Sequence, residues 1–183
     1  MHDKEAKGIL DFWFSDNVRP LWFNSTPELD TEIRERYQNL WRQAQQGMLD
    51  SWLDDAESAL AFIILLDQMP LNMFRGLPES FQTEQQAIKA TYIALEKGYA
   101  EQLPKSRLAF LLIPLMHSEN LYDQQKSVEL FKHYGLMENL QFAQHHQKIV
   151  ERFGRFPHRN AILGRLSTSE EETYLASDEA FKG

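Results

Sequence analysis

The feature that most constrains the fold is a run of apolar residues in the first half of the chain. The segment DAESALAFIILLDQM, residues 55–69, contains no Gly or Pro and no polar-apolar alternation. It is too short to cross a bilayer, and without strand punctuation it favours a helix over a strand. A helix that is apolar on every side must be enclosed by other elements. We therefore predict a central buried helix, capped at its start by Asp54 or Asp55.

Helical periodicity continues through the rest of the chain. Apolar residues recur at helical spacing in segments 9–14, 33–44, 83–98, 106–115, 120–133 and 138–153. Ser167, Thr168 and Ser169 precede three glutamates, a pattern typical of a capped helix start. No alternating segment and no Asn-Gly or Asp-Gly pair indicates a strand or hairpin. The prediction is an all-α fold of about eight helices, arranged as a bundle or as stacked helical hairpins.

Two prolines are expected to interrupt helices. A proline lacks a backbone donor and restricts the residue before it. Pro70 is therefore predicted to stop the central helix, so that a turn follows Asp67 and Gln68. At Pro114 we expect the helix to end or kink just before His117.

Residues suited to helix ends occur at several of the predicted boundaries. Thr83 is a plausible N-cap of the helix that follows the Pro70 turn, because its hydroxyl can accept a bond from a free backbone N–H. Gly98 and Gly135 are natural helix stops, since glycine adopts the left-handed conformation at low cost.

Composition excludes several classes of function. The 183 residues carry 19 Lys+Arg against 27 Asp+Glu, a formal net charge of -8, and fit a single helical domain over residues 1–183. A net negative chain argues against nucleic acid as a partner. There is no cysteine, so disulfides and thiolate chemistry are excluded. Residues 1–11 lack an apolar core, which predicts no secretory signal, no membrane association and a cytoplasmic location.

Polar residues that could form a site concentrate in three segments, each beside a predicted helix break. The segment RFGRFPHRNAILGR, residues 152–165, is basic and contains no acid. The segment HSENLYDQQKS, residues 117–127, would place Glu119 and Asp123 on one face of a helix. The segment DQMPLNMFRG spans residues 67–76. The candidate ligand-binding residues are Asp67, Asn72, Arg75, His117, Glu119, Asp123, Arg155, His158, Arg159 and Asn160.

A structural role competes with a binding role for these residues. Arginine stays ionised and is costly to bury unpaired, so it needs an internal carboxylate or an anionic ligand. One buried ionic centre could instead order the helices without any ligand; it would contain Asp67, Arg75, Glu119, Asp123, Arg155 and Arg159. No zinc or EF-hand motif is present, and we predict neither a metal nor a cofactor.

Four motifs together resemble an uncharacterised bacterial family, domain of unknown function nine-two-four. They are ILDFWF from residue 9, LLDQMPLNMFRG from residue 65, PLMHSENLYDQQKSVELF from residue 114 and ERFGRFPHRNAILGR from residue 151. The second motif departs from the family pattern, with Met69 and Leu71 where Phe and Arg are usual. The resemblance implies a tetratricopeptide-like single domain of stacked antiparallel helix pairs. It implies no activity.

Three functional hypotheses follow. The first is a binding module in which the Arg, His and carboxylate residues hold a small anionic molecule or a peptide carboxylate. The second is a hydrolase or lyase, in which the catalytic candidates are His117, Glu119, Asp123 and His158. The third is a scaffold with a protein partner, which would present an apolar or mixed groove away from the three segments. Whether the protein is an enzyme is left open.

Overall fold

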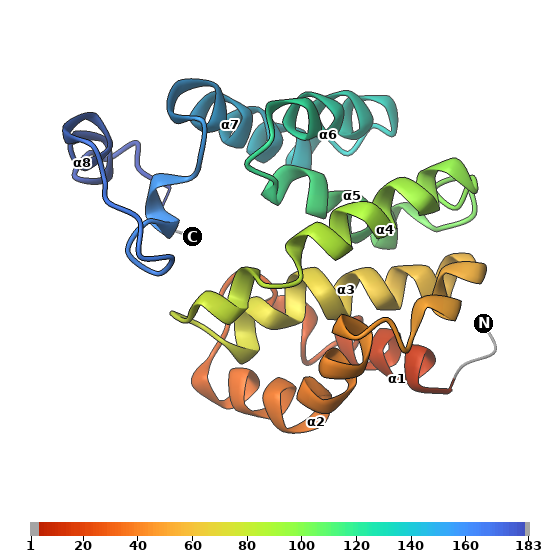
Figure 1. Ribbon diagram of the computed structural model, residues 1–183. Coiled ribbons are helices and arrows are strands. Elements are labelled where there is room, and N and C mark those ends of the chain that lie inside the picture. Colours follow the sequence, from red (N-terminus) through yellow and green to blue (C-terminus); the bar gives the residue numbers. More distant parts are fainter. Residues whose placement is uncertain (1–3, 182–183) are drawn as a thin grey trace. The chain divides into compact units, whose positions relative to one another are not determined.

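The computed structural model describes residues 4–181, and helices form nearly all of its regular structure (Figure 1). The α-helices are α1 Lys4–Trp13, α2 Pro27–Gln45, α3 Ala56–Met73, α4 Glu84–Glu96, α5 Lys105–His117, α6 Leu121–His133, α7 Met137–Phe153 and α8 Ser169–Leu175. Short 3-10 turns are η1 Arg19–Leu21, η2 Asp50–Asp54, η3 Pro78–Phe81 and η4 Pro157–Arg159. With eight α-helices and no strand in residues 4–181, the predicted all-α class is confirmed.

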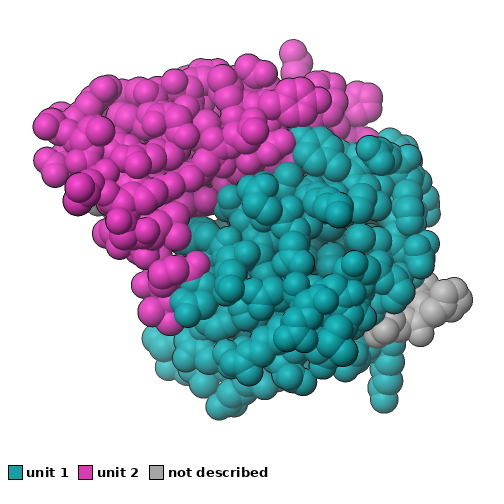
Figure 2. Space-filling model, in the orientation of Figure 1, with its two compact units in different colours: residues 1–75, 79–114 teal, residues 76–78, 115–183 magenta. Residues whose placement is uncertain are grey.

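The chain divides into two compact units (Figure 2). Unit 1 contains residues 1–75 and 79–114, and unit 2 contains residues 76–78 and 115–183. The single domain over residues 1–183 and the tetratricopeptide-like repeat remain predictions. In the part of the chain that the structure describes, no helix has the length and apolarity needed to cross a membrane.

The core of unit 1 is built around α3. Every residue from Ala59 to Pro70 is buried, and α1, α2 and α4 pack against this helix. The Asp55 carboxylate caps α3 by accepting a hydrogen bond from the Ser58 N–H at 3.0 Å. The central buried helix is thus confirmed, with Asp55 as its cap.

The prediction that Pro70 stops this helix is wrong. Helix α3 continues to Met73 with Pro70 inside it, so Asp67, Gln68 and Asn72 are helical. Pro70 cannot donate to the Leu66 carbonyl four residues earlier. The Thr83 hydroxyl donates to that carbonyl instead, at 2.6 Å, and the carbonyl therefore keeps a partner.

Thr83 stands at the N-cap position of α4, as predicted, but its side chain does not cap the helix. Its hydroxyl is completely buried; it donates to Leu66 and accepts a hydrogen bond from the Trp41 indole N–H at 3.0 Å. The Thr83 hydroxyl therefore bonds to a carbonyl of α3 and not to the backbone N–H groups at the start of α4. Gly98 follows α4 with a φ of 67°, which confirms the predicted stop.

The second internal proline also lies inside a helix. Helix α5 continues past Pro114 to His117, so the helix does not end at the proline. The Thr91 hydroxyl, which extends from α4, donates to the Leu111 carbonyl at 3.0 Å in the turn that precedes Pro114. Thr91 within α4 therefore donates a hydrogen bond to α5, and Thr83 at the start of α4 donates one to α3.

In unit 2, helices α6 and α7 form an antiparallel hairpin (Figure 1). Gly135 lies in the turn between them with a φ of 68°, as its position in the sequence predicted. Helix α8 begins with the predicted capping box, in which Thr168 accepts from the Glu171 N–H and the Glu171 carboxylate accepts from the Thr168 N–H. A small apolar core joins α7 and α8; its buried members are Ile149, Val150, Phe156 and Tyr174.

Replacing Thr83 by Val is expected to lower the free energy of unfolding by roughly 1 to 3 kcal/mol, because the buried Leu66 carbonyl and Trp41 indole lose their shared partner. Thr83→Ser keeps the hydroxyl and should lose less. Thr31→Val is the matched control, since the Thr31 hydroxyl is exposed on α2, and it should change stability by less than about 0.5 kcal/mol. Urea unfolding followed by circular dichroism measures all three; equal losses for Thr83→Val and Thr31→Val would contradict the assignment.

Candidate functional site

Several of the predicted site residues pair with carboxylates of their own unit. In unit 1, Arg75 binds Asp30, with Nε 2.6 Å from Oδ2 and Nη2 3.1 Å from Oδ1. Asn72 donates to the same carboxylate at 2.8 Å. Burial alone would raise the pKa of Asp30, but hydrogen bonds from Arg75, Asn72 and Ser25 lower it overall. Asp30 was not predicted, because nothing in the first turn of α2 marks it as the partner of a residue so far along the chain.

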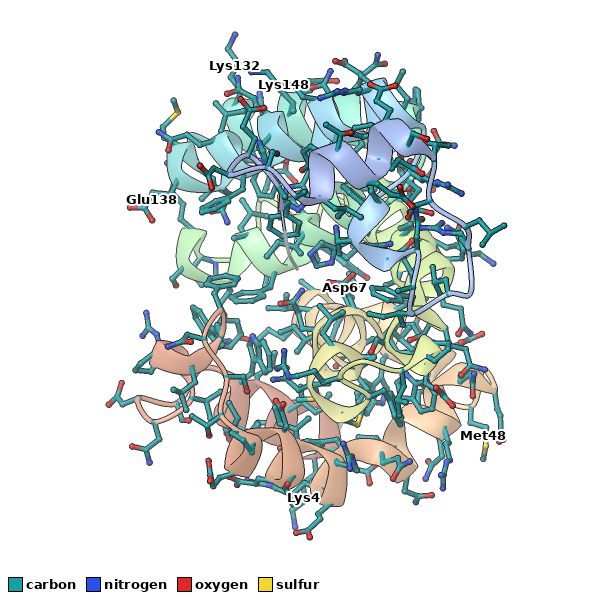
Figure 3. All side chains as sticks on the ribbon, turned by 90° about the vertical axis from the view of Figure 1, so that its left-hand side faces the viewer. Lys4, Met48, Asp67, Lys132, Glu138 and Lys148 are labelled. Carbon is teal, nitrogen blue, oxygen red and sulfur yellow. The ribbon has the colours of Figure 1, made fainter. Side chains whose placement is uncertain are left out.

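Asp67 lies inside α3 and is 5% exposed (labelled in Figure 3). It accepts a hydrogen bond from the Gln68 side chain, whose Nε2 lies 2.6 Å from Oδ2. The predicted turn directly after Asp67 and Gln68 is wrong, because α3 continues to Met73.

The main ionic contact of unit 2 joins Glu119 to Arg165. Arg165 Nη1 lies 2.7 Å from Glu119 Oε2, and Nη2 lies 2.8 Å from Oε1, which makes the pair bidentate. The Phe156 N–H also donates to Glu119 Oε1, at 2.7 Å. Burial raises the pKa of Glu119, but these donors lower it overall.

The predicted pairing of Glu119 with Asp123 on one helical face is wrong. Asn120 caps α6, so Glu119 precedes the helix and the two residues do not share a helical surface. Asp123 accepts a hydrogen bond from the Ser118 hydroxyl at 2.7 Å.

Arg155 also has an internal partner. Its Nε and Nη2 donate to the two carboxylate oxygens of Glu171 at 2.7 and 2.8 Å, and Nη2 also donates to the Leu166 carbonyl. Hydrogen bonding from Arg155 lowers the pKa of Glu171 to about 2. Asn160 links the two ion pairs, because it accepts from Arg165 Nε at 3.0 Å and its amide lies 3.4 Å from Glu171 Oε2.

These contacts give Arg155 and Asn160 a structural role. Arg165 and Glu171 were not among the predicted site residues, although both lie in segments with a distinctive pattern. Arg165 belonged to the basic segment, and Glu171 to the acidic start of α8. Because a buried arginine needs a carboxylate partner, the acidic start of α8 could have been predicted to bind Arg155. The sequence does not indicate which of the three adjacent glutamates would do so.

A second cluster in unit 2 contains His117, His158 and Arg159. Arg159 is 5% exposed; its Nη2 donates to the His117 carbonyl at 2.8 Å, and its Cζ lies 4.7 Å above the centre of the Phe156 ring. The His158 ring lies 5.6 Å from the same phenyl ring. His158 Nδ1 is buried and has no hydrogen-bond partner among residues 4–181.

His146 adjoins this cluster and was not a predicted binding residue. It is 4% exposed on the inner face of α7, and its ring lies 5.4 Å from that of Phe156. Its Nδ1 lies 2.8 Å from the Phe142 carbonyl, so Nδ1 carries the proton of the neutral ring. The helical spacing of His146 with Ala143, Ile149 and Val150 is the signal that could have placed it inside.

Burial keeps both inner histidines neutral. It lowers the pKa of His146 to about 3, and it lowers the pKa of His158 to about 4 with a contribution from the positive charge of Arg159. At neutral pH, each ring therefore carries one N–H donor and one bare nitrogen.

Other features of the described chain offer less to a ligand. Within residues 4–181, no three His, Asp or Glu side chains are arranged to hold a metal ion. Unit 1 has a shallow groove of about 350 Å³ between α1 and α2, lined by Glu5, Gly8, Arg36, Tyr37, Asn39, Leu40 and Gln43. This mixed groove contains none of the predicted site residues.

Glu119→Gln is expected to lower the free energy of unfolding by roughly 2 kcal/mol, because Arg165 loses its ionic partner in a site where both side chains are about three-quarters buried. Glu129→Gln is the control; Glu129 pairs with Lys126 on the exposed face of α6, and its loss should cost less than about 0.5 kcal/mol. Urea unfolding at pH 7 compares them. An equal loss of unfolding free energy in both variants would contradict a larger structural role for the pair of Glu119 and Arg165.

Acidification from pH 7 to 5 is expected to destabilise the protein through His146 and His158. Both have folded pKa values below the ordinary 6.5, so the unfolded chain binds protons that the folded chain does not, and stability falls as the pH drops through 6.5. Each histidine should contribute roughly 1 to 2 kcal/mol in this interval. Chemical unfolding at several pH values tests this, and the double variant His146→Gln, His158→Gln should flatten the profile. The control His133→Gln changes an exposed histidine and should leave the slope as it is.

Three comparisons place the chain among known proteins. The family model for bacterial proteins of unknown function, DUF924, matches residues 9–179. A solved structure of a protein of unknown function from Agrobacterium tumefaciens is 36% identical, with a TM-score of 0.87 over 94% of this chain and 97% of that one. No curated protein matches the sequence.

Proposed function

The chain belongs to this bacterial family of unknown function, and we propose that it is a helical binding module for a small anionic molecule or a peptide carboxylate. Of the candidate residues, we assign the ligand contacts to His117, His158 and Arg159 in unit 2. The arginines that bind Glu119 and Glu171 would hold the surrounding loop in place.

The observation that carries this proposal is the buried Nδ1 atom of His158. A buried polar atom without a hydrogen-bond partner is uncommon, since it costs roughly 1 to 3 kcal/mol. In the tautomer with its proton on Nδ1, the ring would donate to a carboxylate or phosphate oxygen. The adjacent Arg159 guanidinium would supply charge, and guanidinium groups suit planar carboxylates.

The geometry gives less support to the hydrolase or lyase. A histidine that acts as a general base needs a partner that orients its ring, and carboxylates commonly serve. His158 Nδ1 has no such partner in the described chain, and the low pKa of His158 makes the ring a weak base. Binding therefore accounts for His158 better than proton transfer does.

The charge and composition of the chain support the remaining parts of the proposal. A formal net charge of -8 favours a small molecule or a protein over nucleic acid as the partner. A chain without cysteine has no requirement for an oxidising compartment, which supports the proposed cytoplasmic location.

A thermal-shift titration tests the proposal, because a ligand that binds the folded state raises the melting temperature. The probes are succinate, inorganic phosphate and tri-alanine with a free carboxyl terminus. At least one should raise the Tm of the wild type by several degrees. His158→Phe keeps an aromatic ring beside Phe156 but removes the nitrogen, and it should abolish the shift.

Arg152→Gln is the matched control. Arg152 belongs to the same basic segment, but its side chain is half exposed and pairs with Glu170, so this variant reports general attraction of anions. It should keep the wild-type shift. The proposal is wrong if no probe raises the Tm, or if His158→Phe responds as the wild type does.

A further inference from the structure

The C-terminal segment packs onto the buried histidines of unit 2. The Phe181 ring lies 4.5 Å from the His146 ring and 5.1 Å from the His158 ring, measured between centres. The Phe181 N–H donates to the Tyr174 hydroxyl at 2.9 Å, which fixes the backbone of the segment. One side chain near the end of the chain thus contacts both histidines.

Phe181 and Phe156 together surround the two imidazoles with apolar surface. The Phe156 ring lies 5.4 Å from His146 and 5.6 Å from His158. Phe156 is fully buried inside unit 2, whereas Phe181 is partly exposed and belongs to a short segment that follows the last helix. Movement of Phe181 is therefore the smaller change that would admit water to the imidazoles.

We propose that residues 177–181 form a releasable latch, which stays closed while His146 and His158 are neutral and opens when either ring is protonated. Release would uncover His158 beside Arg159. The biological use of the latch rests on the proposed function, because that is the cluster assigned to the ligand. The latch itself requires no ligand, so it can be tested without one.

The hydrogen bonds of the two rings give the physical reason for release. His146 already donates from Nδ1, so a second proton must enter at Nε2. In His158, Nδ1 meets no acceptor within residues 4–181, and a protonated ring would therefore hold an unsatisfied N–H there. Attraction between a cation and the Phe181 ring opposes release but is smaller than the cost of a buried charge without water.

The charged groups around the rings favour release overall. His117, His145, Arg159 and Arg165 add positive potential at one ring or the other, and Glu119 adds negative potential at His158. The Glu119 carboxylate is bound by Arg165, which reduces its effect on the imidazole. The latch segment also carries Asp178 and Glu179, but both are exposed, so water and salt screen their attraction for an imidazolium.

The coupling must be reciprocal. If protonation weakens the closed latch, then loss of Phe181 must make protonation easier by the same free energy. NMR of the imidazole signals in Phe181→Ala, from pH 7 to 4, measures this directly. We expect His146 and His158 to titrate at least one pH unit higher than in the wild type.

Phe142→Ala is the matched control, because Phe142 lies on the same helix as His146 but is 58% exposed. It should leave both titrations unchanged. In the wild type, amide exchange at Phe181 should accelerate as the pH falls from 7 to 4, after correction for intrinsic exchange. In the double variant His146→Gln, His158→Gln, the corrected rate should stay constant.

Two results would overturn the latch. One is an unchanged titration of both histidines in Phe181→Ala, with the fold confirmed by circular dichroism. The other is a corrected exchange rate at Phe181 that does not depend on pH in the wild type. Neither result depends on a ligand, and failure of the anion titration would leave both measurements intact.

Discussion

The arrangement of unit 2 depends on a carboxylate at the junction between two helices. Glu119 stands between α5 and α6, where it binds Arg165 and the Phe156 N–H. Arg165 in turn holds Asn160, and Asn160 reaches Glu171 at the start of α8. Because each member satisfies the next, the loop after α7 has one favoured path across the junction. The aromatic ring at the centre of the buried histidine cluster, Phe156, is placed by the same carboxylate.

Local patterns predicted the helices well because their causes are local. The apolar run of α3, the capping box of α8 and the glycine in the hairpin between α6 and α7 each depend on neighbours within one or two turns. Pro70 was misjudged for the opposite reason. Whether a proline ends a helix depends on what else can reach the freed carbonyl, and at Pro70 the hydroxyl of Thr83, the N-cap residue of α4, reaches it. The periodicity of apolar residues does not indicate which side chain from another part of the chain will reach that carbonyl.

The polar residues show the same division. Their types and segments were predictable, but their partners were not, since Arg75 binds Asp30 and Glu119 binds Arg165 across long stretches of chain. The hypothesis of a single ionic centre included neither Asp30, Arg165 nor Glu171, although its own members bind these three residues. His146 was missed as a site residue because a histidine on an apolar helix face has no distinctive local signature. Its importance comes from Phe156 and Phe181, which meet it only in the folded chain.

The threonine that serves Pro70 also limits the order in which these two positions can change during evolution. If Pro70 is replaced first, the new backbone N–H can bond to the Leu66 carbonyl, and the Thr83 hydroxyl becomes dispensable for that carbonyl. If Thr83 is lost first, the carbonyl stays buried without a donor, and that intermediate is less stable. One mutational route is therefore open while the reverse route passes through a destabilised protein. A pair of residues joined by a single hydrogen bond thereby acquires a preferred direction of divergence.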